Sequence, residues 1–152
     1  LAFSSLQTAK EVDGKFIEAY LRSAELSLYL KDYEKTMFDL KQAILLDKLN
    51  PTAYFLRGWA LKEQGDTINA VKDYQKAIEY FPANQNLYYW VGVCAGYMAK
   101  SSLDYNGTGN LSQKENYLKL SESAYLRALE LYIKKQWFTI LFDMGKIQGP
   151  VL

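Results

Sequence analysis

The sequence predicts an all-α protein made of about three successive pairs of amphipathic helices, followed by an extra helix at the C-terminal end. Three observations support this prediction. A 34-residue period recurs along the 152 residues, each period contains two stripes of apolar residues at helical spacing, and turn-forming residues separate the two stripes.

The period is carried by two series of residues that keep the same register. One series consists of tyrosines and the other of small residues. They are Tyr20, Tyr54 and Tyr88, and Ala24, Gly58 and Gly92. Because independent coincidences would not share one register, the two series indicate true internal repeats.

The middle period, 51–84, shows most clearly how one helix pair is encoded. Its first helix begins at Pro51, a residue that the first helical turn tolerates. Gly65 ends this helix, since glycine adopts the left-handed conformation that helix ends often need. The second helix stops before Pro82. We expect Gly58, in the first helix, to let the two backbones approach closely. The two apolar stripes are Tyr54, Gly58 and Leu61, and Ala70, Tyr74, Ala77 and Ile78.

The remaining elements follow from the same period. In the third period the second-helix signature recurs 51 residues after Ala77, at Ala128, so about 17 residues are inserted. Turn-forming residues predict a loop over 101–111, and Ser112 to Glu115 fits a capping box that restarts a helix. The predicted helices are 15–30, 33–47, 51–64, 67–81, 85–99, 113–132 and 136–147.

The middle period resembles the tetratricopeptide repeat at nearly every signature position. The matching residues are Tyr54, Gly58, Leu61, Gly65, Asp66, Ala70, Tyr74, Ala77 and Pro82. The resemblance implies a right-handed superhelical array of antiparallel helix pairs with a concave binding face, and a role as a scaffold for peptides or partner proteins. The implied domains are an N-terminal leader (1–16), a repeat domain (17–50, 51–84, and 85–132 with the insertion near 100–116) and a C-terminal capping or packing helix and tail (133–152).

Composition argues against several classes of function. The 18 basic and 17 acidic residues nearly cancel, which gives no general attraction to nucleic acid. With no histidine and with Cys94 as the single cysteine, the sequence lacks the usual zinc ligands and the commonest general base. We therefore expect no cofactor, no metal and no enzyme activity. Charges interrupt every apolar stretch, so we expect a soluble chain without membrane insertion, whether cytoplasmic or exported after processing.

A second aromatic face is left over after the helix pairing is accounted for. Phe55 and Trp59 lie about 100° around their helix from its pairing stripe. The resemblance implies that the first helix of each pair lines the concave groove, where these side chains would project. An aromatic groove with a charged end suits an apolar or amphipathic peptide. The predicted binding residues are Arg22, Glu25, Tyr29, Phe55, Trp59, Tyr89, Trp90 and Tyr97.

The C-terminal tail is an alternative occupant of that groove. Trp137, Ile140, Leu141 and Met144 follow helical spacing within a segment that is apolar on other faces as well, so we expect it to be buried. Four partners remain open: the third pair, the groove, a second copy, or repeats beyond this sequence. The second interpretation is therefore a self-associating structural module, a homo-oligomer formed through 136–152.

The best-defined activity of the resembled family, clasping the C-terminal carboxylate of heat-shock chaperones, does not fit this sequence. The resemblance places the clasping positions at Leu21, Glu25, Leu56, Asn86 and Trp90, none of which supplies a cation. Glu25 would also repel a carboxylate. We therefore predict a scaffold that binds a peptide or a partner protein in an aromatic-lined groove and is not a carboxylate clamp.

Overall fold

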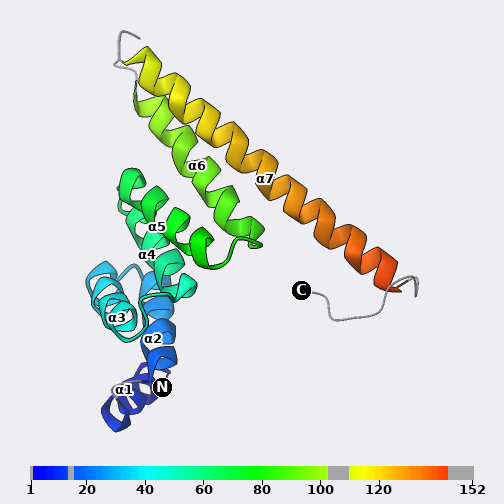
Figure 1. Ribbon diagram of the computed structural model, residues 1–152. Helices are drawn as coiled ribbons and strands as arrows, with labels where there is room; N and C mark the ends of the chain where they lie inside the picture. Colours follow the sequence, from blue (N-terminus) through cyan, green and yellow to red (C-terminus); the bar gives the residue numbers. More distant parts are fainter. Residues whose placement is uncertain (1, 14–15, 103–109, 144–152) are drawn as a thin grey trace. The chain divides into compact units, whose positions relative to one another are not determined.

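The computed structural model describes residues 2–13, 16–102 and 110–143, and within them the side chains from 4 to 139. In these ranges the chain forms seven α-helices and no strand, which confirms the all-α prediction (Figure 1). The helices are α1 (Ala2–Val12), α2 (Ile17–Tyr29), α3 (Tyr33–Leu46), α4 (Pro51–Glu63), α5 (Thr67–Tyr80), α6 (Gln85–Ser101) and α7 (Leu111–Asp143).

The packing divides the chain into two compact units. Unit 1, Leu1–Pro82, holds α1 to α5, and unit 2, Ala83–Leu152, holds α6 and α7. In unit 1, α2 pairs with α3 and α4 pairs with α5, while α4 also packs against α2 and α3. The N-terminal helix α1 packs against α2. In unit 2, α6 and α7 form one helix pair.

Polar side chains start the helices at positions that repeat with the 34-residue period. The carboxylates of Asp32 and Asp66 accept hydrogen bonds from backbone N–H groups in the first turns of α3 and α5. The side chains of Asn50 and Asn84 do the same for α4 and α6. Each cap satisfies a donor that has no partner inside the helix, so the sequence fixes where each helix begins.

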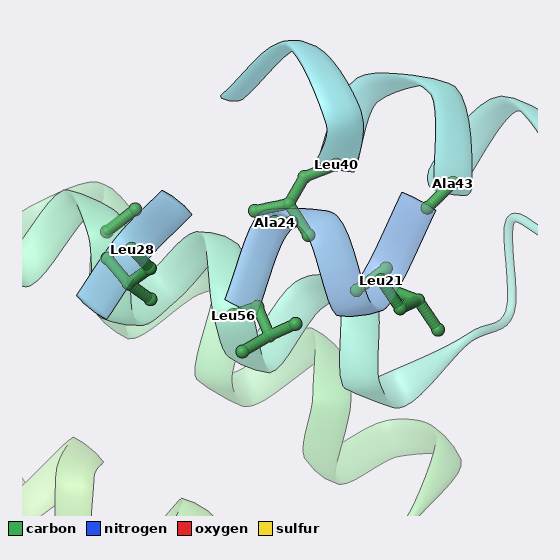
Figure 2. Close-up of a cluster of buried hydrophobic side chains, with 8 residues drawn as sticks. Leu21, Ala24, Leu28, Leu40, Ala43 and Leu56 are labelled. Carbon is green, nitrogen blue, oxygen red and sulfur yellow. The ribbon is translucent and has the colours of Figure 1, made fainter. Parts of the chain in front are cut away.

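The core of unit 1 is a layer of leucines and alanines between α2, α3 and α4. Figure 2 shows the side chains of Leu21, Ala24 and Leu28 from α2 directed at residues of the two neighbouring helices. Phe55 and Trp59 pack against this core while remaining partly exposed. The whole cluster is Leu21, Ala24, Leu28, Leu40, Ala43, Ala53, Leu56 and Ala60.

Glycines mark the closest approach of the two helices in the second and third pairs. A Cβ atom added to Gly58 would lie 2.8 Å from Cε1 of Tyr74, and one added to Gly92 would lie 2.9 Å from Cδ1 of Tyr125. Tyrosine rings thus pack directly on the backbone of the first helix. Gly92 follows Gly58 by 34 residues and Tyr125 follows Tyr74 by 51, so the contacts agree with the predicted insertion of about 17 residues.

The inserted residues lengthen the third pair as well as its connection. α6 has 17 residues where α4 has 13. Asn110 caps α7 by accepting a hydrogen bond from the backbone N–H of Gln113 at 2.8 Å, so this helix begins at Leu111. The capping box predicted at Ser112 is therefore wrong by two residues. Of the predicted loop 101–111, residues 103–109 lie outside the described residues.

Two helix predictions need correction. The predicted set has no helix before residue 15, whereas α1 occupies most of the leader. The predicted break between 132 and 136 does not exist, because α7 continues through it to Asp143. That stretch contains no proline or glycine, and lysine and glutamine favour helix. The predicted extra helix is therefore the second part of α7; residues 144–152 lie outside the described range.

We predict that Gly58→Leu destabilises the protein by about 1–3 kcal/mol, because the new side chain must displace the fully buried ring of Tyr74. Urea unfolding followed by circular dichroism measures the change. Equal unfolding midpoints for the variant and the parent protein would contradict the close contact.

Gly92 and Gly96 provide a matched comparison within α6. A Cβ atom at Gly96 meets nothing nearer than Oγ of Ser121 at 3.6 Å, whereas one at Gly92 collides with Tyr125. We expect Gly96→Ala to raise stability by about 0.5–1 kcal/mol, since alanine favours helix over glycine. Gly92→Ala should lower stability. Thermal unfolding of the two variants gives the comparison, and shifts of the same sign would refute it.

Candidate functional site

A groove runs between α2 and α4, the first helices of the first two pairs. It encloses about 260 Å³. Leu21 and Leu56 are almost completely buried in its floor, and Phe55 is partly exposed beside them. The lining residues are Glu18, Leu21, Arg22, Glu25, Asn50, Thr52, Phe55 and Leu56.

Charged side chains from α2 form one wall of the groove. The guanidinium of Arg22 donates to Glu18 with Nε to Oε1 at 2.7 Å, and to Glu25 with Nη1 to Oε2 at 3.1 Å. These hydrogen bonds raise the pKa of Arg22 above its ordinary value, with Glu18 the larger cause. Two carboxylates surround one cation, so this wall carries a net negative charge. The sequence predicted Arg22 and Glu25 at the groove.

The opposite wall and the adjoining surface are neutral and aromatic. Phe55 and Trp59 lie one turn apart on α4, with ring centroids 6.4 Å apart. Trp59 also meets the ring of Tyr29 from α2 edge to face at 5.4 Å. Tyr29 is 65% exposed. Three of the predicted binding residues therefore form one partly exposed aromatic cluster in unit 1, which we call the Trp59 cluster: Tyr29, Phe55 and Trp59.

Unit 2 has an aromatic group of its own. The ring of Tyr89 lies edge to face with Trp90 at 5.2 Å and with Tyr125 of α7 at 5.8 Å. Tyr89 also borders a hollow of about 280 Å³ between α6 and α7, together with Leu129 and Tyr132. Tyr97, two turns further along α6, is 60% exposed.

The predicted binding residues thus divide between the two units, and each group coheres within its own unit. That they form a single binding patch remains a prediction. Sequence reasoning missed Asn50 and Thr52, which end the groove beside the start of α4, and it missed the contribution of Tyr125 and Tyr132. The 51-residue offset between Tyr74 and Tyr125 was the available signal for the third pair, but it was used only for the packing stripe.

Chemistry at this surface is limited to contacts. Within the described residues, no three His, Cys, Asp or Glu side chains gather in a way that could hold a metal ion. Cys94 is completely buried in α6, in agreement with the packing role expected for it. No helix in the described part of the chain is both long enough and apolar enough to cross a membrane.

Sequence comparison finds the tetratricopeptide repeat at residues 51–84. A stretch of 28 residues, 18% of the chain, is 75% identical to Ring protein 1 of Bacteroides phage crAss001 and covers 12% of that protein. Over 135 residues, 85% of the chain, identity to Tetratricopeptide repeat protein 37 of Xenopus laevis is 28%, covering 8% of that protein. The chain therefore spans about a tenth of the length of these curated relatives.

Solved structures resemble the fold over most of the chain. A crystal structure of MamA superposes with a TM-score of 0.70 at 21% identity, over 88% of this chain and 68% of that one. A second MamA crystal structure gives 0.67 at 19% identity, over 90% of this chain and 65% of that one. The repeat match, the full-length relative and the shared fold agree with the helix pairs described above. The chain belongs to the tetratricopeptide repeat family.

Proposed function

We propose that this chain is a protein-interaction module whose unit 1 groove binds a peptide segment of a partner protein. The observation that carries the proposal is the groove between α2 and α4, with an apolar floor and the Trp59 cluster beside it. Tetratricopeptide repeats generally act as interaction scaffolds rather than as catalysts, so family membership points the same way.

The aromatic side chains supply the binding energy in this proposal. Partly exposed tryptophan and tyrosine rings dominate protein interfaces, because they bury large apolar areas while losing little conformational entropy. Trp59 is held between Tyr29 and Phe55, which fixes its ring before any partner arrives. The aromatic group around Tyr89 and Trp90 is proposed as a second contact for the same partner.

The charges of the groove set the chemistry of the peptide. A terminal carboxylate is disfavoured, since Glu18 and Glu25 already hold the guanidinium of Arg22. Leu21 and Leu56, at two of the clasping positions, are buried and apolar. We therefore propose a peptide that inserts apolar side chains and carries neutral or basic neighbours, and not a carboxylate-terminated one.

Trp59→Ala should weaken partner binding by about 2 kcal/mol, roughly 30-fold, without changing the helical content. A partner recovered with the parent protein would be titrated into both proteins by isothermal calorimetry. Phe38→Ala is the matched control, because Phe38 is a 61% exposed aromatic residue on α3 that does not line the groove. Unchanged affinity in the Trp59 variant would exclude the groove as the binding site.

A second candidate function, self-association, is supported by the surface of α7. Four apolar side chains follow one another at i, i+3, i+7 and i+11 and are each 45–60% exposed. Such a stripe is typical of a helix that packs against another helix. The predicted burial of Trp137 within the chain is wrong, since it is 60% exposed. The stripe consists of Leu126, Leu129, Ile133 and Trp137.

If the stripe of α7 drives self-association, Leu129→Glu combined with Ile133→Glu should convert a dimer into a monomer of 17.5 kDa. Size-exclusion chromatography with light scattering measures the mass. Leu45→Glu is the control, because Leu45 is equally exposed but lies on α3. A parent protein that is already monomeric at high concentration would rule this function out.

A further inference from the structure

A buried ion pair joins the N-terminal helix to the first helix pair. Nζ of Lys10 in α1 donates to Oδ1 of Asp39 in α3 at 2.6 Å, and the two side chains are only 9% and 3% exposed. The other carboxylate oxygen accepts a hydrogen bond from the hydroxyl of Ser23 in α2 at 2.5 Å. The ammonium group also lies 5.0 Å from the ring centroid of Tyr20. Lys10 thus occupies a polar pocket formed by α2 and α3.

The second helix pair solves the same problem differently. Asp73 follows Asp39 by 34 residues and is equally a buried carboxylate on the second helix of its pair. Its cation is Arg57, which donates Nε and Nη2 to the two carboxylate oxygens, each at 2.7 Å. Arg57 stands 34 residues after Ser23. The second pair therefore neutralises its carboxylate internally, whereas the first pair has a serine at that place and takes the cation from outside.

The third pair shows that the fold does not require this charge. The corresponding positions hold Val91 and Ala124, which are 3% and 5% exposed. An apolar contact fills the space between α6 and α7 there. A buried carboxylate without a cation is costly, so Asp39 is compatible with a stable first pair only when a cation from another helix reaches it.

Few other parts of α1 are covered. Among its described side chains only Leu6, Ala9 and Lys10 are partly buried, and Val12 is 83% exposed. The apolar contribution to docking is therefore small, while a buried ion pair adds little net stability beyond the cost of removing both charges from water. The docked state of α1 consequently depends on whether its lysine fills the pocket.

We infer that Ser23 and Asp39 form a binding site for a cationic side chain presented on a helix, and that α1 is its occupant through Lys10. The site lies on the α2–α3 face and recognises an alkylammonium or guanidinium group by one carboxylate, one hydroxyl and one aromatic ring. It is distinct from the proposed peptide groove, whose α2 residues are Glu18, Leu21, Arg22 and Glu25.

The test compares full-length variants by hydrogen exchange of residues 2–12 and by thermal unfolding. Lys10→Met keeps the length of the side chain and removes the charge, so exchange in α1 should accelerate at least tenfold and the melting temperature should fall. Lys10→Arg should preserve both. Adding Ser23→Arg to Lys10→Met copies Arg57, and should restore the melting temperature while α1 remains unprotected.

This separation of the two readouts distinguishes a binding site from general packing. Exchange of α1 that is unchanged in Lys10→Met would overturn the inference, as would a melting temperature that Ser23→Arg fails to restore. If Lys10→Met does not fold, the double variant Lys10→Met with Asp39→Ala reproduces the uncharged arrangement of the third pair. In that variant α1 should again exchange rapidly, and retained protection would refute the inference.

Discussion

The structure depends on how closely the two helices of each pair approach. A large side chain from the second helix lies on the backbone of the first, and a small residue makes room for it: Tyr74 on Gly58 in the second pair, and Tyr125 on Gly92 in the third. In the first pair Ala24 and Leu40 occupy the corresponding positions, both fully buried. The ring needs the glycine, whereas the smaller leucine tolerates a Cβ atom. This one contact fixes the register of each pair and so decides which residues face outwards.

The groove follows from that register. With Gly58 facing α5, the neighbouring positions Phe55 and Trp59 face away from the partner helix and towards α2. The α2–α4 contact buries Leu21 and Leu56 beneath them. The surface that we propose for partner binding is thus made of residues that pairing leaves over, and pairing holds them rigidly in place.

The periodic part of the fold could be predicted from the sequence because each pair repeats the same signals. Helix caps, small residues and the insertion in the third pair all lie in one register, and α2 to α6 match the predicted helices closely. The Trp59 cluster was equally accessible, since helical spacing alone brings Phe55 and Trp59 together. What lacks a period was missed: α1 occurs once, and its lysine meets Asp39 across 29 residues of sequence.

The end of α7 failed for a different reason. The apolar spacing around Trp137 was correctly recognised as helical, but nothing in it distinguishes a new helix from a continuing one. A loop was assumed because each earlier helix is 13 to 17 residues long beyond the leader. In fact the third pair has no need of a turn at 132–136, since α6 begins at Gln85, next to Leu129 and Tyr132. Pairing no longer constrains α7 beyond that point.

The length of α7 has a consequence for how this part of the chain folds. Residues from about 133 to Asp143 extend past the start of α6, as Figure 1 shows for these two helices. An isolated helix shorter than about 12–15 residues is marginal in water, because nucleation is costly and side-chain packing normally supplies the stability. This extension therefore inherits its order from the helix behind it and frays first from its free end. A protein that covers it would complete the folding of the segment as it binds, so that affinity and local helix stability become one quantity.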